Sequence, residues 1–347
     1  MTATQWQSEL MTQGAHIEDG AVQHFGDPLL ERKITALGNV LCDLSHLGLL
    51  ELKGADTVSF LQGQVTNDVK LLRGDNAHYS GYCSPKGRLL ALFLAFAHQD
   101  HVHLQLPQDL LAPIMKRLTM YVMRSKVVIT DTSDSIIKIG VNGPDATRLM
   151  QAIFGQVPSQ DYALVGLEQA TLLKLPTAQQ QARYEIFTSS EHAQTIWNSL
   201  KTDCQPVGKA CWDSLEIQAG IPEIVANTQE QFVPQMVNLD CLNAINFKKG
   251  CYTGQEIVAR THYLGTVKRR TFLASIVTDT LPMAGDKLLD ANNSEVGQLV
   301  RVAKGLDNNI DVLAELRIEA QQTGTVYWQG QLLRFNALPY SLGTTGT

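Results

Sequence analysis

Several features that would place a protein in a specialised class are absent from this sequence. The first 31 residues contain no Lys or Arg. They therefore match neither a secretory signal, which has a basic start, nor a mitochondrial transit peptide, which is rich in arginine. The longest apolar run, 89–97, has nine residues, far fewer than the ~20 that a membrane-spanning helix needs. We expect a cytoplasmic protein that does not bind a membrane.

The chain also has few charged residues and no closely spaced cysteine pairs. Charged residues make up 18% of the chain and its net charge is −6, which excludes a generally basic nucleic-acid coat. The six cysteines include no CxxC pair and no histidine at zinc-finger spacing, so we expect no metal site made from local ligands. The 347 residues suffice for two or three folding units, each with its own core.

The middle of the chain mixes strand and helix patterns. Strands are predicted at 79–83 and 88–97, joined by the turn signal at 84–87. A helix with one apolar face follows at 107–118. A second set of strands and helices covers 127–200. This mixture favours an α+β fold over a doubly wound α/β fold.

The two ends of the chain differ from the middle. Residues 1–33 are interpreted as an N-terminal arm that is loosely structured or helical. From residue 268 onward, short strands alternate with Gly or Asn turns and no helical period appears. This pattern predicts a small all-β domain over 268–347, a sandwich or a barrel. The region between them, 34–267, is expected to form two α+β subdomains.

The most informative segment for function is KGCYTGQE, residues 249–256. Two glycines flank the Cys251-Tyr252 pair and allow the backbone to approach a ligand closely. A helix is expected to begin directly afterwards, and helix N-termini lower thiol pKa values. Residues 248–270 hold six basic side chains and one acidic one, which indicates either an anionic ligand or a solvated charged turn. Cys251 is interpreted as a reactive thiolate or, alternatively, as a small packed side chain.

Four other side chains have both a functional and a purely structural interpretation. Trp212 precedes a long segment with little periodicity, 223–254, and it could stack on an aromatic ligand or pack in a core. The amides of Gln235 and Asn238 suit the edge of a heterocycle such as a pterin, and they also suit loop bracing, the commoner role. Asp68 could contact a ligand or cap a helix.

Five motifs follow one another between roughly residues 45 and 270: FLQGQVTNDV (60–69), GYCSPKGRLL (81–90), WDSLEIQAGIP (212–222), FVPQMVNLD (232–240) and KGCYTGQE (249–256). In this order they resemble the YgfZ family, folate-binding proteins related to the T-protein (aminomethyltransferase) of the glycine cleavage system. The resemblance implies a T-protein-like ring of α+β folate-binding subdomains followed by a β-barrel. It also implies tetrahydrofolate, or a derivative of it, as the cofactor.

The same resemblance implies a role in supporting iron–sulfur enzymes or their assembly factors and, through them, tRNA modification. Direct contact with tRNA is left open. The reactive group would be Cys251, with Lys249 favouring its thiolate. The residues assigned to folate binding are Trp212, Gln218, Gln235, Asn238, Tyr252, Gln255 and Asp68. No metal ligand is implied.

The chain also departs from the T-protein pattern. T-proteins carry acidic residues shortly after the hairpin glycine, where this chain has Leu90-Ala91. No carboxylate is then present there to assist aminomethyl transfer. Gln218 stands where T-proteins have a Glu in an LRxEAG run, which predicts weaker pterin binding. A one-carbon (aminomethyl) transferase is therefore the second hypothesis, and a non-catalytic module that binds tRNA or a protein is the third.

Overall fold

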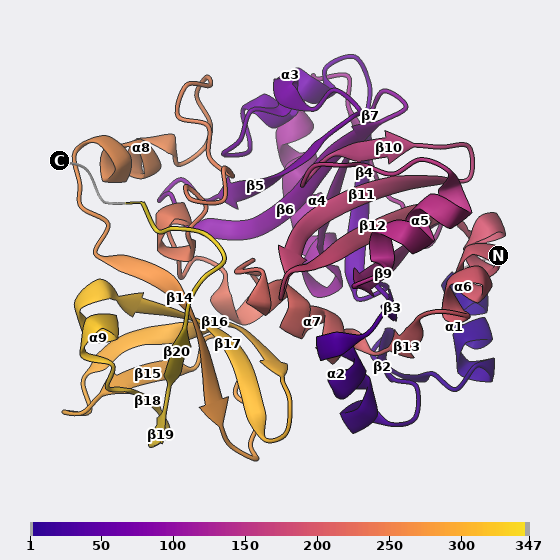
Figure 1. Ribbon diagram of the computed structural model, residues 1–347. Coiled ribbons are helices and arrows are strands. Elements are labelled where there is room, and N and C mark those ends of the chain that lie inside the picture. Colours follow the sequence, from indigo (N-terminus) through magenta and orange to yellow (C-terminus); the bar gives the residue numbers. More distant parts are fainter. Residues whose placement is uncertain (1–2, 344–347) are drawn as a thin grey trace. The chain divides into compact units, whose positions relative to one another are not determined.

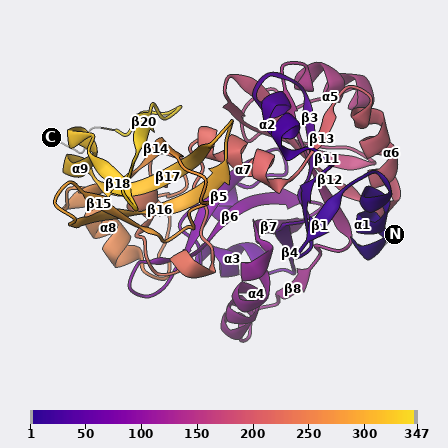
Figure 2. The same ribbon diagram turned by 90° about the horizontal axis from the view of Figure 1, so that it is seen from below.

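The computed structural model describes residues 3–343, whose contacts divide them into two compact units. The first unit comprises residues 3–55, 72–77 and 95–215. The second unit comprises residues 56–71, 78–94 and 216–343. Figures 1 and 2 show the helices and strands of both units from two directions.

The first unit is built on a six-stranded sheet. Neighbouring strands are antiparallel except for the edge pair β13–β3, which is parallel. In spatial order the strands are β10 (Leu164–Gly166), β11 (Ala170–Ala178), β12 (Gln181–Ser189), β9 (Ile136–Gly143), β3 (Val40–Asp43) and β13 (Gln205–Val207). The helices that contact these strands or one another are α1 (Ala3–Thr12), α2 (Pro28–Leu37), α5 (Ala146–Phe154) and α6 (Ser190–Lys201).

The N-terminal segment contributes to the core of this unit. Besides α1 and α2 it forms a hairpin of β1 (His16–Glu18) and β2 (Ala21–His24). Trp6 and Leu10 are completely buried, and the Trp6 ring meets the Trp197 ring edge-on with 5.5 Å between centroids. Since residues four apart lie on one helix face, α1 packs Trp6 and Leu10 together against α6. The helical alternative for the N-terminal segment is therefore the better description.

A second sheet has five strands. In spatial order they are β5 (Ala77–Cys83), β6 (Leu89–His98), β7 (His101–Pro107), β4 (Leu47–Lys53) and β8 (Val128–Asp131). Strands β5 and β6 confirm the predicted hairpin around 84–87. Helix α4 (Gln108–Val122) packs on β4, β7 and β8. Its buried residues are the predicted apolar face, Leu110, Leu111, Ile114 and Leu118.

The second unit contains a nearly closed antiparallel β-barrel. In spatial order its strands are β19 (Gln331–Leu332), β18 (Val326–Trp328), β15 (Lys287–Asp290), β16 (Glu295–Lys304), β17 (Asn309–Arg317), β14 (Arg269–Val277) and β20 (Arg334–Asn336). The predicted β-barrel is thus confirmed. A short helix, α9 (Ile318–Thr323), lies beside β17 and β18. The sequence analysis missed it because six residues are too few to show a helical period.

The remaining elements belong to the segments that carry the motifs. They are α3 (Thr57–Gln62), η1 (Val69–Leu71), α7 (Lys209–Gln218), η2 (Ala226–Thr228), η3 (Pro234–Val237) and α8 (Gln255–Tyr263), where η denotes a 3₁₀ helix. The α+β class is confirmed. The limits proposed for an arm and two domains, at residues 33 and 267, stay predictions. No helix within 3–343 is both long enough and apolar enough to cross a membrane.

Candidate functional sites in the two units

The KGCYTGQE loop lies against the hairpin turn 84–87 in the second unit. Gly254 has φ +82° and opens helix α8, and a Cβ at this position would lie 2.5 Å from the carbonyl oxygen of Ser84. Gly87 has φ +66°, and a Cβ there would lie 2.7 Å from Ile257 Cβ. Only glycine fits both positions without a clash. Two motifs that are far apart in the sequence therefore meet through their glycines.

Lys249 joins a third motif to this loop. Its Nζ donates to the carbonyl oxygens of Val65 at 2.6 Å and Asn67 at 2.8 Å, and the residue is 9% exposed. The ammonium also lies 5.1 Å from the centroid of the Tyr252 ring. Burial lowers the pKa of Lys249 to about 8. Its hydrogen bonds give Lys249 a structural role in holding the loop, beside the catalytic role predicted for it.

Cys251 has different surroundings from the other cysteines. It is exposed, whereas Cys42, Cys83, Cys204 and Cys211 are buried and Cys241 is partly buried. Burial raises the pKa of Cys83 to about 12 and that of Cys211 to about 11, which suppresses their thiolates at neutral pH. Cys251 is therefore the cysteine that a reactant from solution can approach.

Two buried polar groups near Lys249 have no partner. The Tyr252 hydroxyl forms no hydrogen bond with a described residue although Tyr252 is only 8% exposed, and its pKa is raised by burial. Nε2 of His78 is likewise buried and unpaired, and burial together with the charge of Lys249 lowers the His78 pKa to about 4. His78 was not singled out from the sequence, because a histidine in a strand gives no motif.

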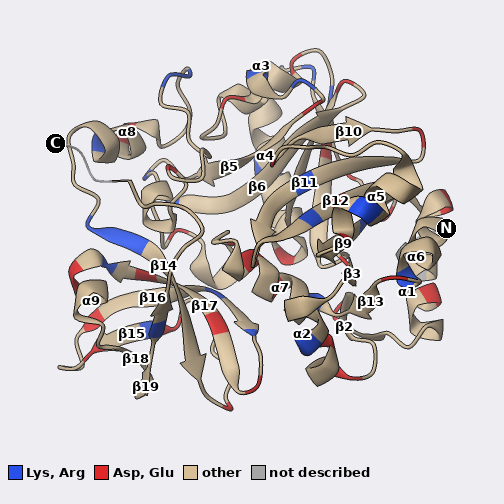
Figure 3. Cartoon of the chain, in the orientation of Figure 1, with Lys and Arg blue, Asp and Glu red and all other residues tan. Residues whose placement is uncertain are grey.

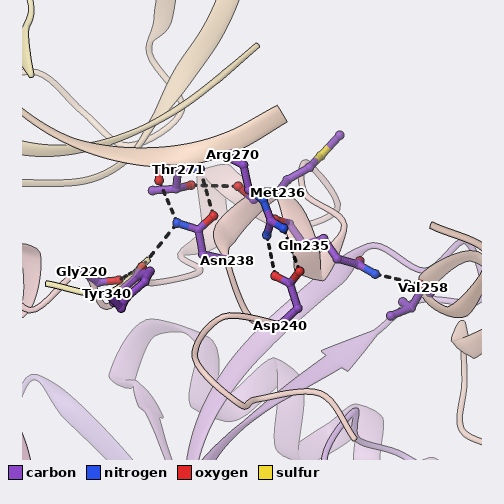
Figure 4. Close-up of polar contacts among 9 residues, drawn as sticks. All are labelled: Gly220, Gln235, Met236, Asn238, Asp240, Val258, Arg270, Thr271 and Tyr340. Carbon is purple, nitrogen blue, oxygen red and sulfur yellow. Dashed lines mark hydrogen bonds and ion pairs between the residues drawn. The ribbon is translucent and has the colours of Figure 1, made fainter. Parts of the chain in front are cut away.

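Gln235 and Asn238 belong to a bracing network in the second unit, shown in Figure 4. Asn238 Nδ2 donates to the carbonyl of Thr271 at 2.7 Å, and its Oδ1 accepts from the Thr271 amide at 3.3 Å. Gln235 Nε2 donates to the carbonyl of Val258 at 2.7 Å, whereas its Oε1 has no partner among the described residues. Asn238 thus has its amide occupied, and Gln235 keeps one buried acceptor.

Three other predicted folate contacts are at the ends of helices. Asp68 Oδ1 accepts from Gln62 Nε2 at 2.9 Å and from the Lys70 amide at 3.1 Å, at the start of η1. Gln255 is the first residue of α8, and Gln218 is the last residue of α7. Both glutamines are partly exposed. Their backbone positions fit the predicted elements, and their role in binding stays a prediction.

Part of the positive charge of the basic segment 248–270 is neutralised by ion pairs. Arg269 pairs with Glu315, and Arg270 forms a two-point pair with Asp240 at 2.6 and 2.9 Å. Lys249 is held by carbonyl groups, as described. The exposed cations that form no ion pair with a described residue are Lys248, Arg260 and Lys268. Figure 3 shows Lys and Arg residues on α8 and at the start of β14.

In the first unit, the six-stranded sheet has one apolar and one polar face, and both are buried. Tyr184 and Ile186 of β12 point into the hydrophobic core. The residues that alternate with them, Arg183 and Glu185, are 0% and 2% exposed. On the paired strand β9, Lys138 is 2% exposed, and burial lowers its pKa to about 8. A buried charged face is costly and requires specific partners, which marks it as a candidate ligand site.

Trp212 lies on this polar face. It is 1% exposed, and the Arg183 guanidinium is 5.4 Å from its ring centroid. A Cβ at Gly140 would lie 2.5 Å from the indole, so the glycine makes room for the ring. The indole Nε1 is buried and has no hydrogen-bond partner within residues 3–343. Trp212 is therefore packed and also keeps an unused donor.

A cavity of about 270 Å³ lies between strands of the two sheets within the first unit. Its wall includes Phe96, His103 and Phe187. The Phe96 ring stacks on His103 at 5.0 Å and contacts Phe187 at 4.7 Å. Burial lowers the pKa of His103 to about 4, so the imidazole is neutral at pH 7. The aromatic wall suits a planar organic ligand.

Several polar atoms on these strands are buried without a partner in the described chain. Besides Trp212 Nε1, they are His103 Nδ1, Gln105 Oε1 and Asn142 Oδ1. Unpaired buried polar atoms are uncommon in folded proteins, and such atoms can accept a hydrogen bond from a bound molecule or donate one to it. A partial signal of this polar face is present in the sequence, since Arg183 and Glu185 alternate with apolar residues in a strand. Residues 3–343 contain no group of three or more His, Cys, Asp or Glu side chains that could hold a metal ion.

Comparisons with known proteins agree with this architecture. The family model described as GCVT N-terminal domain matches residues 30–249. A tRNA-modifying protein YgfZ from Yersinia pseudotuberculosis is 33% identical over 315 residues, covering 87% of this chain and 92% of that protein. The YgfZ of Yersinia enterocolitica is 31% identical over 310 residues, with the same coverage of both chains.

Among solved structures, the aminomethyltransferase T of the glycine cleavage system from Bartonella henselae has the same fold. The TM-score is 0.76, and the alignment covers 96% of each chain at 16% sequence identity. At this identity the similarity concerns the fold alone. The mixed α+β fold with a terminal barrel is therefore that of the T-protein.

Proposed function

Because the chain belongs to the YgfZ family of tRNA-modifying proteins, we propose that it is a folate-binding accessory protein for iron–sulfur proteins. Through those clients it would support tRNA modification. Its cofactor would be tetrahydrofolate or a derivative, and its reactive group would be the thiol of Cys251. The partners would be iron–sulfur enzymes or their assembly factors.

The observation that carries folate binding is the set of buried polar atoms of the first unit that have no partner among the described residues. A pterin edge bears amide and amine N–H donors as well as a carbonyl acceptor. The unpaired acceptors Gln105 Oε1 and Asn142 Oδ1 suit those donors, and the Trp212 N–H suits the carbonyl. The neutral His103, stacked on Phe96, adds an aromatic wall. These residues fit the cofactor that the family relationship indicates.

Cys251 is proposed as the reactive group because of its exposure and its fixed backbone. The loop around it is held by Lys249 on one side and by Gly254 on the other. Such anchoring presents the thiol in one place, which favours reaction with a bound partner. The folate would supply a one-carbon carrier or a reduced pterin, and the chain's own contribution would be the thiol.

Calorimetric titration with tetrahydrofolate tests the cofactor proposal directly. We expect saturable binding to the wild-type chain and at least tenfold weaker binding to Trp212→Phe, which keeps an aromatic ring but loses the unpaired donor. Trp328→Phe in the barrel is the matched control, since the Trp328 indole donates to Asp286 instead, and its affinity should be unchanged. The absence of binding to the wild-type chain would refute the proposal.

A folate-dependent aminomethyltransferase is the second candidate, favoured by the shared fold with the T-protein. The strand that follows the hairpin glycine argues against it, because Leu90 and Ala91 are apolar and 8% and 0% exposed. Neither can act as a general base. Tetrahydrofolate-dependent release of ammonia from an aminomethyl donor would reveal this activity, and turnover would reverse our preference.

A further inference from the structure

A second cavity, of about 680 Å³, lies within the second unit beside the end of helix α8. Most of its wall comes from three segments: the loop that follows η3, the stretch from the last turn of α8 to Val267, and residues Ser341 and Gly343. Gln235 of η3 and Arg270 of β14 complete it. The segment 241–248 between the FVPQMVNLD and KGCYTGQE motifs has no role in the function proposed above. We therefore ask what this cavity could bind.

Aromatic rings form one side of the cavity. Phe247 and His262 both line it, and their rings are stacked with 3.7 Å between centroids and 12° between planes. Tyr263 packs edge-on against His262 at 4.7 Å and is 64% exposed. Leu264 beside it is 85% exposed. An exposed stack of rings at a cavity edge offers a surface for a further flat ring.

The wall of the cavity also carries a polar group without a partner. Gln235 lines the cavity and is 1% exposed, and its Oε1 accepts no hydrogen bond from a described residue. The neighbouring Arg270 and Asp240 neutralise each other. A ligand in this cavity would therefore need an N–H donor for Gln235 and would not need a net charge at that place.

Three cations are direct sequence neighbours of residues that line the cavity. Within segment 248–270, each exposed cation that forms no ion pair with a described residue is the direct sequence neighbour of a lining residue: Lys248 follows Phe247, Arg260 precedes Thr261, and Lys268 follows Val267. Three cations on separate segments match several linked anionic groups better than one.

From these observations we propose that the α8 cavity binds an unpaired nucleobase of an RNA strand, with flanking phosphates at Lys248, Arg260 and Lys268. The base would stack on the Phe247–His262–Tyr263 rings, and its amino or imino N–H would donate to Gln235. A duplex is excluded because its bases are already stacked and paired. The proposal goes beyond the proposed function, since it requires neither folate nor Cys251.

Fluorescence anisotropy with a labelled 12-nucleotide RNA of mixed sequence, added to the full chain, tests this inference. We expect saturable binding at low salt. A logarithmic plot of affinity against salt should have a slope of about −2, from roughly 0.7 per phosphate contact and three contacts. The same RNA in a duplex should bind at least tenfold more weakly, and adenosine monophosphate should displace the strand only at a far higher concentration.

Variants locate the site. His262→Ala and Tyr263→Ala change exposed residues, so the fold should persist, and each should weaken RNA binding about tenfold through lost stacking. Lys248→Ala with Lys268→Ala should reduce the salt slope by about 1.4. Lys116→Ala with Arg124→Ala, two exposed cations of the first unit, should change nothing.

Four outcomes would overturn the proposal: no binding at 20 mM salt, equal binding of the duplex, displacement by the free mononucleotide as effective as by RNA, or binding that the α8 variants leave intact. If the wild-type chain binds tetrahydrofolate but not RNA, this inference is rejected and the proposed function is not affected. Loss of folate binding with RNA binding retained would reject the proposed function alone.

Discussion

Lys248 and Lys249 are neighbours in the chain but have opposite surroundings. Lys248 is exposed, and Lys249 is buried with two carbonyl acceptors from another motif. In the sequence both lysines belong to one basic segment. Their different burial could not be predicted, because the hydrogen-bond partners of Lys249 are more than 180 residues away. For the same reason, the burial of His78 and His103 could not be predicted from the sequence, because it depends on strands that are distant in the sequence.

We expect Lys249→Met to destabilise the chain by about 1–3 kcal/mol, since it leaves the buried carbonyls of Val65 and Asn67 without their donor. Lys248→Met should change the free energy of unfolding by less than about 0.5 kcal/mol. Chemical denaturation followed by circular dichroism measures both. Equal effects of the two substitutions would show that the hydrogen bonds of Lys249 do not hold the loop.

His103 makes stability depend on pH. Burial lowers its pKa in the folded chain to about 4, from an ordinary value of 6.5. As the pH falls below 6.5, the unfolded chain binds the proton first, so the stability present above pH 6.5 is progressively lost toward pH 4. This one group should remove roughly 2 kcal/mol between pH 7 and pH 5.

His103→Phe is the corresponding variant, because a phenyl ring can stack on Phe96 without titrating. Denaturation at pH 7 and pH 5 should show a smaller loss of stability for the variant than for the wild type, by roughly the 2 kcal/mol assigned to this group. An identical pH dependence of the two chains would contradict the assigned pKa shift.

Among the helices and strands, those with a clear period were predictable from the sequence. The hairpin β5–β6 and the buried face of α4 follow from alternation and from helical spacing. Helix α1 has only Trp6 and Leu10 for its apolar face, and its stability depends on Trp197 of α6. Such a helix gives a weak local signal, since its partner is distant in the sequence.

The contact between the KGCYTGQE loop and the hairpin turn 84–87 predicts how glycine substitutions in the loop change the stability of the chain. Gly254→Ala should cost more than about 2 kcal/mol, because the residue has φ +82° and its Cβ would meet Ser84 at 2.5 Å. Gly250→Ala, four residues earlier, should be nearly neutral, since a Cβ there meets nothing within 4 Å. Thermal unfolding of both variants measures the difference.

If Gly254→Ala unfolded at the wild-type temperature, the two motifs would not be in the close contact described. The glycine pattern was visible in the sequence, where it predicted close approach of the backbone to a ligand, which stays a prediction. In the structure Gly254 approaches the turn 84–87, and a Cβ at Gly250 would meet nothing within 4 Å. The partner of that approach, the turn 84–87, was not deducible, because nothing local to either segment specifies the other.

For the whole molecule, the fold of the T-protein is retained at 16% identity. The apolar positions that build sheets and barrel tolerate many substitutions of similar volume, so a fold persists while its chemistry changes. Here the residues after the hairpin glycine are Leu90 and Ala91, and an exposed Cys251 lies on a loop anchored to that hairpin. The family and fold class could be predicted from the motifs, whereas the buried polar face of the first unit required the structure.

Rescue of a bacterial strain that lacks its own family member tests the role of Cys251 most directly. The measured quantity is the content of a tRNA nucleoside whose modification requires an iron–sulfur enzyme. Wild type and Cys241→Ser, which alters the partly buried thiol, should restore it, and Cys251→Ser at equal protein level should not. Full restoration by Cys251→Ser would contradict a reactive thiol at this position.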